Sequence, residues 1–457
     1  MSVSVMLFTS DLRVHDQPAL AAAVRDGDAV VPLFVLDAGI HRAGFDAPNR
    51  RAFLADSLAS LDRGLRERGG RLVVRSGAVV DEVCRVVAAT GARSVHVAAG
   101  VSRYATRRED ALRSALTAAG AALHVHDGVV TALPPGRVTP ADRDHFAVFT
   151  PYFRRWEAAG TRPVVTAPRR ITVPDTAGEP LPARSSVSGV SPGLAAGGEE
   201  EGRRRLTAWL ARPASGVDSY AERHDDLAGD ATSRLSPHLH FGTLSPVELV
   251  RRARDKGGPG AEAFVRQLAW RDFHHQVLAA RPDAAAADYR SRGDRWRDDP
   301  KEIDAWREGR TGCPVVDAGM RQLRHEGWMH NRARLLTASY LAKTLYADWR
   351  TGAAHFLDLL VDGDMANNQL NWQWVAGTGT DTRPNRILNP LTQARRFDPD
   401  GEYVRRWVPE LAGVPGRAVH DPAALPAAER ARLDYPDPLV DLTAARDRFT
   451  EARGLNR

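Results

Sequence analysis

The sequence predicts two structural halves, an α/β N-terminal domain with a doubly wound parallel sheet and an all-helical C-terminal domain. Up to about residue 130, short β-branched runs alternate with helical patterns, which is typical of a parallel sheet covered by helices. From residue 203 onward the apolar spacing becomes helical. The stretch between them lacks periodicity and is rich in proline, glycine and serine. We therefore expect domains at residues 1–130 and 204–457, joined by a linker at residues 131–203.

Five short apolar runs are the expected strands of the sheet. They are residues 3–8, 29–37, 71–77, 94–99 and 122–128, and residues 50–68 form the clearest helical pattern between them. No GxGxxG sequence follows the first run, so the usual dinucleotide fingerprint is missing. Any ligand of this half is therefore expected to be of another kind.

The first run ends in the sequence DLRVHD, which carries Asp11, Arg13, His15 and Asp16. These residues fall at the carboxyl edge of the predicted sheet, where such folds place ligands or domain contacts. A simpler interpretation is that the four side chains form an ion-pair cluster that stabilises the structure.

The linker has two parts. Residues 145–156, HFAVFTPYFRRW, are aromatic enough to pack as a short ordered segment, whereas residues 172–202 cannot bury enough apolar surface to order themselves strongly. Beyond the linker, Ser236-Pro237 and Ser245-Pro246 indicate helix starts, each with a hydroxyl cap followed by proline.

Composition and charge narrow the class of protein. The chain has 457 residues, a formal net charge of +6 and only two cysteines, Cys84 and Cys313. Two cysteines provide neither a disulfide framework nor a metal-binding spacing, so we expect no metal site. No run reaches the length of a membrane span, and we expect a cytoplasmic protein. The modest positive charge is compatible with a polyanionic partner but also with an ordinary surface.

Residues 327–374 are the richest in candidate functional side chains. Helical spacing between Trp328 and Tyr346 places Asn331, Arg334 and Leu335 on one side of a helix. The residues that follow bring two carboxylates and two amides directly before two tryptophans. They are Asp362, Asp364, Asn367, Asn368, Trp372 and Trp374.

Tryptophan is unevenly distributed along the chain. Eight of the ten tryptophans lie in the second half, which indicates a large aromatic ligand or an electron path as well as a core. They are Trp270, Trp296, Trp306, Trp328, Trp349, Trp372, Trp374 and Trp407.

Residues 230–242, DATSRLSPHLHFG, gather hydroxyls and an arginine at a predicted helix N-terminus. Free backbone N–H groups and the helix dipole favour an anion there, so Thr232, Ser233, Arg234 and Ser236 are candidate diphosphate ligands. Any capped helix start looks similar, and both interpretations stay open.

Residues 264–278 form a helix with a polar and aromatic face. Gln267, Trp270 and His274 share this face, and Arg271 lies beside them, an arrangement that suits a flat base better than a core. The chain has no nucleophile elbow, P-loop or HExxH motif, so hydrolysis and phosphoryl transfer lack support.

Six motifs in order resemble the photolyase and cryptochrome family of flavoproteins. They are YAERHDDLAGDATSRLSPHLHFG, FVRQLAWRDFHHQV, GRTGCPVVDAGMRQL, GWMHNRAR, DGDMANNQLNWQW and GTGTDTRPNRILNP. The resemblance runs from DLRVHD to RRWVPEL, which ends at Leu411. It implies an N-terminal antenna domain that can carry a second pigment, a deazaflavin or a reduced folate, and a helical domain that binds FAD and DNA.

The resemblance also implies roles for individual residues. The flavin-binding residues would be Tyr220, Thr232, Ser233, Arg234, Leu235, Ser236, Arg271, Arg334, Asp362, Asp364 and Asn368. Asn368 would face the reactive N5, and Trp372, Trp349 and Trp296 would relay electrons to the flavin. The damaged bases would contact Gln267, Trp270, Asn331 and Trp374.

The implied function is light-driven repair of cyclobutane pyrimidine dimers in DNA, by electron transfer from excited reduced FAD to a flipped-out lesion. We expect a monomer. Two positions depart from the commonest dimer-repair pattern, because Gln267 replaces a usual glutamate and Leu335 a usual methionine. The alternatives are a six-four photolyase, which would resemble GWxHHxxRH with two histidines where this chain has Asn331 and Leu335, and a cryptochrome-type blue-light receptor.

Signalling cryptochromes commonly add a long C-terminal tail, which this sequence lacks after Leu411. In the antenna loop, Gly100 and Arg103 stand where relatives tend to carry an acidic residue and a proline. Dimer repair therefore ranks first, and which second pigment binds, or whether any does, stays open.

Overall fold

The computed structural model describes residues 2–455, which form two compact units. The first unit comprises the chain up to Val190 together with Ala195–Ala221 and Ser233–Pro282. The second comprises Ser191–Leu194, Glu222–Thr232 and the chain from Asp283 onward. Because each unit combines separated segments, the domain boundaries predicted at residues 130 and 203 stay a prediction.

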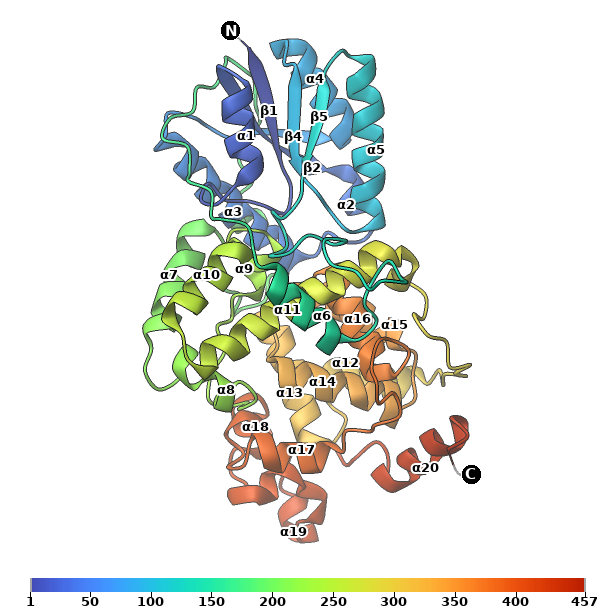
Figure 1. Ribbon diagram of the computed structural model, residues 1–457. Coiled ribbons are helices and arrows are strands. Elements are labelled where there is room, and N and C mark those ends of the chain that lie inside the picture. The colour runs from blue at the N-terminus through green and yellow to red at the C-terminus, as the bar shows by residue number, and fades with distance from the viewer. Residues whose placement is uncertain (1, 456–457) are drawn as a thin grey trace. The chain divides into compact units, whose positions relative to one another are not determined.

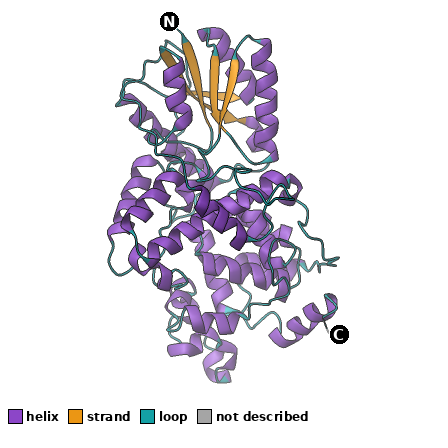
Figure 2. Cartoon of the chain, in the orientation of Figure 1, coloured by secondary structure: helices purple, strands orange, loops and turns teal. Residues whose placement is uncertain are grey.

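The first unit contains a parallel five-stranded sheet. Its strands are β1 (Val3–Phe8), β2 (Ala29–Asp37), β3 (Val73–Gly77), β4 (Ser94–Ala98) and β5 (Ala122–His126). They lie in the order β3-β2-β1-β4-β5, and every neighbouring pair is parallel. Figure 2 shows them together, surrounded by helices and loops. The predicted doubly wound sheet is confirmed.

Helices cover both faces of this sheet. They are α1 (Pro18–Asp26), α3 (Pro48–Arg66), α4 (Val79–Thr90) and α5 (Arg103–Ala118), whereas the short α2 (Ala38–Arg42) buries no residue. Strand order reverses between β1 and β4, so right-handed crossovers put α1 and α3 on one face and α4 and α5 on the other. In Figure 1, α1 lies to the left of the strands and α5 to their right. Buried Val5, Leu7, Val83 and Leu112 belong to the apolar core that this layering produces.

The rest of the first unit is helical. Its helices are α6 (Phe149–Ala159), α7 (Glu199–Ala211), α9 (Ser236–His240), α10 (Pro246–Lys256) and α11 (Pro259–Ala280), and α8 (Tyr220–Arg223) lies where the chain passes between the units. Helix α6 confirms the predicted ordered segment within the linker. Ser245 caps α10 by accepting a hydrogen bond from the Glu248 amide, as predicted. The cap predicted at Ser236 is wrong, because Leu235 occupies the N-cap position, without a side-chain cap, and α9 begins at Ser236.

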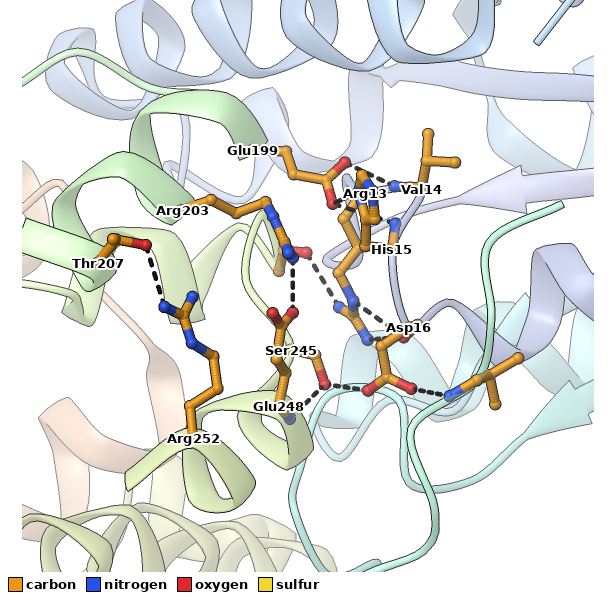
Figure 3. A network of polar contacts seen from close by, with 12 residues as sticks. Arg13, Val14, His15, Asp16, Glu199, Arg203, Thr207, Ser245, Glu248 and Arg252 are labelled. Atoms are coloured by element: carbon orange, nitrogen blue, oxygen red, sulfur yellow. Dashed lines mark hydrogen bonds and ion pairs between the residues drawn. The ribbon is translucent and has the colours of Figure 1, made fainter. Parts of the chain in front are cut away.

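The DLRVHD segment forms a buried polar network inside the first unit (Figure 3). The Arg13 guanidinium donates to the carbonyls of Asp16, Gly242 and Val129 at 2.9–3.2 Å. Asp16 pairs with Arg162 at 2.5 Å. Glu199 accepts hydrogen bonds from two backbone amides of the segment, at 2.8 and 3.0 Å. These contacts confirm the predicted ion-pair cluster, and they satisfy the Arg13 charge, which would otherwise be costly to bury.

The second unit is helical and has its own core. Its helices are α12 (Pro300–Glu308), α13 (Pro314–Glu326), α14 (Asn331–Ser339), the π-helical turn η4 (Tyr340–Thr344), α15 (Trp349–Leu359), α16 (Met365–Ala376), α17 (Pro390–Phe397), α18 (Glu402–Trp407), α19 (Ala427–Arg430) and α20 (Leu442–Ala452). Its core includes Trp306, Leu341, Phe356, Trp372 and Tyr403. The all-helical second half is therefore confirmed. Within residues 2–455, no helix combines the length and apolar character needed to cross a membrane.

Candidate functional site

A buried ion pair joins α14 to the segment before α16 in the second unit. The Arg334 Nη2 atom lies 2.8 Å from Asp362 Oδ2, and Arg334 Nε donates to the Met329 carbonyl at 2.8 Å. The Asp362 side chain is only 3% exposed, whereas that of Arg334 is 23% exposed. The Asp362 carboxylate thus holds the Arg334 guanidinium in place, while part of the Arg334 side chain remains exposed. Removal of Arg334 would leave an uncompensated buried charge, which is strongly destabilising.

The start of α16 is fixed by Asp364. Its carboxylate accepts hydrogen bonds at 2.7 Å from both the backbone amide and the side-chain amide of Asn367, so Asp364 is the N-cap of the helix. The next residue, Asn368, is buried, and its Nδ2 donates to the Ala353 carbonyl of α15 at 3.1 Å. The Asp364 cap and the hydrogen bond to Ala353 together hold the side-chain amides of Asn367 and Asn368 in defined positions on the first turn of α16.

The three tryptophans predicted to relay electrons lie in different environments. Trp372 is buried and meets the Phe356 and Trp306 rings edge-on, with centroids 4.9 and 6.0 Å apart. Trp349 is fully buried, and its Nε1 donates to Asp288 at 2.9 Å. Trp296 is half-buried, with the Tyr346 ring 5.1 Å away. Exposure is therefore greatest at Trp296, the predicted outer end of the relay.

Gly352 is required by the packing of α15 on α16. A Cβ atom at this position would stand 2.2 Å from Cη2 of Trp372, well inside van der Waals contact. The glycine therefore lets the indole lie directly against the α15 backbone, and any side chain there would displace the ring.

Three further predicted residues of the second unit differ in exposure. Asn331 is exposed at the first position of α14, and Trp374 is half-buried with the Arg386 guanidinium 5.4 Å from its ring centroid. The Thr232 Oγ1 atom is buried and has no hydrogen-bond partner among residues 2–455. This hydroxyl is therefore free to bind a polar ligand.

In the first unit, the predicted diphosphate segment has unusual backbone geometry. Arg234 has φ of 51°, a left-handed conformation that is uncommon for a residue with a side chain. Ser233 Oγ accepts a hydrogen bond from the Leu235 amide at 3.4 Å, and Leu235 is buried. Tyr220 is also buried, with its ring edge-on to Trp209 and Phe264. Strained backbone of this kind clusters at ligand sites, although α9 itself has only five residues and contributes little dipole.

Helix α11 presents the face predicted to contact damaged bases. Gln267 is exposed, and Trp270 is half-buried because the Phe149 ring stacks on it with centroids 3.7 Å apart and planes 8° apart. Arg271 donates to the backbone carbonyls of Val130 at 2.7 Å and Leu239 at 3.3 Å. One face of the Trp270 indole is therefore already covered, and the Arg271 guanidinium is held in place by the backbone.

Comparison with known proteins decides the family. The model described as "DNA photolyase" matches residues 4–171, and the model described as "FAD binding domain of DNA photolyase" matches residues 264–454. The chain is 68% identical over 458 residues to a deoxyribodipyrimidine photo-lyase of Streptomyces griseus, with 100% of both chains covered. The chain belongs to the DNA photolyase family.

Two solved structures have the same fold. A cryptochrome of Synechocystis sp. PCC6803 matches with a TM-score of 0.91 and 28% identity, covering 99% of both chains. An archaeal photolyase of Sulfolobus tokodaii, described with two FAD molecules, matches with a TM-score of 0.84 and 30% identity, covering 99% of this chain and 100% of that one. Photolyases and cryptochromes therefore share this fold, and the fold does not separate repair from signalling.

The chain carries the FAD-binding domain of a DNA photolyase, and its described side chains fit a flavin. In the second unit the orphaned Thr232 hydroxyl can bind a polar ligand, and the Arg334 guanidinium can face an electron-rich ring. Arg334 and Asp362, both implied by the family resemblance to bind the flavin, form an ion pair. Direct contact of these and the other predicted residues with FAD stays a prediction.

Three aromatic residues near the photolyase site were not assigned roles from the sequence. Phe149 stacks on Trp270, Trp306 meets Trp372, and Tyr346 lies beside Trp296. Each contact joins segments far apart in the sequence, so helical spacing could not reveal it. Only the aromatic density of residues 145–156 gave a signal, and it predicted packing rather than contact with Trp270.

Proposed function

We propose that this protein is a deoxyribodipyrimidine photo-lyase that repairs cyclobutane pyrimidine dimers in DNA with light. The observation that carries the proposal is the 68% identity over the whole chain to a protein of that name. FAD, when bound, reduced and excited by light, would supply the electron that splits the dimer and would recover it once the ring has opened. The protein's own residues bind the cofactor, position the lesion and exclude competing reactions.

The flavin ring and ribityl chain bind to the second unit. The Arg334–Asp362 pair would hold a positive charge beside the ring, Asp364 would accept a hydrogen bond from the flavin, and the Asn368 carboxamide would face N5. This assignment is supported by the rigidity of the group, since Asp364 caps α16 and Asn368 is anchored to α15. Fixed dipoles stabilise developing charge without having to reorganise during the reaction.

The diphosphate binds to the segment from Thr232 to Ser236. Its hydroxyls and Arg234 suit a phosphate chemically, and Tyr220 and Leu235 would belong to the same binding site. Arg271 contributes a charge fixed by two carbonyls. The orphaned Thr232 hydroxyl and the left-handed Arg234 backbone support the assignment.

Trp372, Trp349 and Trp296 supply electrons from the surface to the flavin. Indole is among the most easily oxidised side chains, and the outermost of these rings is half-exposed whereas the other two are buried. Packing of α15 against α16, with Gly352 under the Trp372 ring, supports transfer between helices that are closely apposed.

The lesion leaves the DNA stack, and Gln267 and Trp270 of the first unit and Asn331 and Trp374 of the second unit are each predicted to contact the damaged bases. A damaged base pair costs less to extrude than an intact one, which provides part of the selectivity. Exposed Gln267 donates and accepts hydrogen bonds at a pyrimidine edge, and the free face of Trp270 stacks on a base. A six-four activity is disfavoured because Asn331 and Leu335 stand where its two histidines would be.

A second pigment binds at the carboxyl edge of the sheet in the first unit. The Arg108 Nε atom is buried there without a hydrogen-bond partner among residues 2–455, and Tyr104 and Ile40 expose large apolar surfaces. A deazaflavin, a reduced folate or, as described for the Sulfolobus tokodaii photolyase, a second FAD would fit this chemistry. Extraction of the purified protein and mass spectrometry would distinguish the three.

The deciding experiment is photorepair by the purified protein. An oligonucleotide containing one cyclobutane dimer is illuminated with the reduced enzyme, and restored pyrimidines are measured by chromatography against a dark control. Repair that depends on light supports the proposal. A protein that binds FAD and changes its flavin spectrum in light but restores no pyrimidines would instead be a cryptochrome-type receptor.

A further inference from the structure

Three histidines gather on one face of the sheet at its β4–β5 edge. His96 of β4 is in register with His124 of β5, and His126 lies two residues further along β5. Because alternate residues of a strand point to the same face, all three rings lie on one side. The His96 ring stacks on His124 and on His126, with centroids 4.8 and 5.3 Å apart. Neither the flavin site nor the lesion site uses these residues.

A carboxylate completes the cluster. Asp26, the last residue of α1, places its Oδ2 atom 3.3 Å from His96 Nε2. One donor atom from each of Asp26, His96 and His124 lies within 4.8 Å of the other two. His96 is buried, whereas Asp26 and His124 are exposed and can turn their side chains. Helix α1 and two strands thus contribute to one group of nitrogen and oxygen donors.

We propose that Asp26, His96 and His124 bind one divalent transition-metal ion of the Zn²⁺ type, with His126 as a positioning residue for His96. Zinc takes histidine nitrogen and carboxylate oxygen ligands at about 2.0–2.2 Å, which puts the donors of a tetrahedral site roughly 3.3 Å apart. The 3.3 Å between Asp26 and His96 already fits this spacing. Small rotations of the two exposed side chains bring in the third donor, and water completes the coordination.

The contacts of His96 allow the tautomer that a metal requires. Its Nδ1 lies 3.0 Å from His126 Nε2, so a proton on Nδ1 leaves the Nε2 lone pair directed towards Asp26. A ligating histidine usually donates its other N–H to a fixed partner in this way. The Ser94 hydroxyl, 3.3 Å from His96 Nε2, makes the one weak contact that the ion would displace.

The charge of the cluster also suits a cation. Burial, followed by the neighbouring His126 and His124, lowers the pKa of His96 to about 4. At neutral pH the imidazole is therefore uncharged, which is the ligating form, and Asp26 supplies the negative charge. Arg25, which precedes Asp26, opposes a cation but is exposed to solvent.

Such an ion would tie the edge strand β5 to β4 and to α1. A ligand that binds only the folded state stabilises it by mass action. The lack of cysteine spacing predicted no metal site, and this cluster departs from that prediction because its ligands are histidines brought together by strand pairing. Imidazole and carboxylate donors suit zinc, nickel and copper, with copper expected to bind most tightly.

The test uses untagged full-length protein incubated with ZnCl₂ and then desalted, with retained zinc measured by atomic emission. Wild type should retain about one ion per chain, and His124→Ala and Asp26→Asn should bind zinc at least about tenfold more weakly. His126→Gln should weaken binding by roughly 10–100-fold, as loss of an orienting partner does. The matched control is His41→Ala, since His41 is an exposed histidine 3.0 Å from a carboxylate, that of Asp46, and should leave zinc binding unchanged.

A second readout separates ligation from misfolding. Because His124 is exposed, His124→Ala should melt at the wild-type temperature without metal and lose only the rise in melting temperature that zinc produces in wild type. Electron paramagnetic resonance with Cu²⁺ should show nitrogen hyperfine splitting in wild type that decreases in this variant. Equal zinc retention by wild type and His124→Ala, or an equal loss in His41→Ala, would overturn the proposal.

Discussion

Replacement of Trp270 by alanine tests the lesion site most directly. Trp270 lies on α11 one helical turn beyond exposed Gln267, and it is proposed to stack on one base of an extruded dimer. Its indole has two faces, and the Phe149 ring covers one of them at a centroid distance of 3.7 Å. A single face is therefore left for DNA, so the energy of one stacked base sets the size of the effect.

The expected loss follows from this geometry. Base–aromatic stacking contributes about 1–3 kcal/mol per base, so Trp270→Ala should weaken binding of dimer-containing DNA by roughly 5–150-fold. The substitution also removes the stack on Phe149, and an aromatic pair contributes about 0.5–1.5 kcal/mol beyond its buried area. Loss of this aromatic pair reduces the free energy of unfolding and should appear as a lower melting temperature.

Fluorescence anisotropy with matched damaged and undamaged duplexes measures the first effect, and thermal unfolding measures the second. Undamaged duplex is held through phosphates, so its affinity should hardly change in the variant but should fall with added salt. Trp270→Phe, which keeps a ring on Phe149, should retain stability and lose less affinity than alanine. If Trp270→Ala bound damaged DNA as tightly as wild type while folding normally, the proposed stacking would be wrong.

Four further predictions concern the flavin, the electron path and the lesion. The protein should copurify with noncovalent FAD, since no cysteine or histidine of the proposed flavin residues offers covalent attachment; a colourless preparation inactive after FAD addition would contradict this. Trp372→Phe should block photoreduction of oxidised flavin, because phenylalanine is much harder to oxidise, yet spare repair by chemically reduced enzyme; equal loss of both would make Trp372 structural. Arg334→Met should cost about 3–5 kcal/mol of stability by leaving Asp362 buried and unpaired, and should release FAD, whereas unchanged denaturant midpoint and flavin content would refute it. Gln267→Glu should change the yield of dimer repair only moderately, and a complete switch to six-four repair would contradict the proposed pocket.

The sheet was predictable because its physical signals are local. Five runs of β-branched residues alternate with helical patterns, and each run matches a strand of the structure to within a few residues. Strand order needed the crossover rule as well as the pattern. The prediction of Ser236 as the cap was wrong because a serine followed by proline can occupy either the N-cap or the first turn. In this chain Leu235 occupies the N-cap position and Ser236 begins the first turn.

The candidate site was only partly predictable. Asp364, Asn367 and Asn368 could be found because they lie within five consecutive residues, and the structure shows that Asp364 caps the helix that carries the two asparagines. The stack of Phe149 on Trp270 could not be found, since about 120 residues separate the two and only tertiary packing joins them. Direct contacts of either group with flavin or DNA depend on partners that no local pattern describes.

The surroundings of the three relay tryptophans give the proposed electron path a direction. An indole that has lost an electron carries positive charge, which water and carboxylates stabilise and an apolar interior does not. Trp372 lies among the rings of Phe356 and Trp306, so a positive charge there is poorly solvated. Trp349 has the Asp288 carboxylate at 2.9 Å, although Arg350 lies 4.7 Å from its ring and opposes part of that stabilisation. Trp296 is half-exposed, so the solvent itself stabilises a positive charge on its ring. The positive charge should therefore move outward from Trp372 to Trp296 as electrons move inward, and substitution of Trp296 should shorten the life of the separated charges without preventing the first transfer at Trp372.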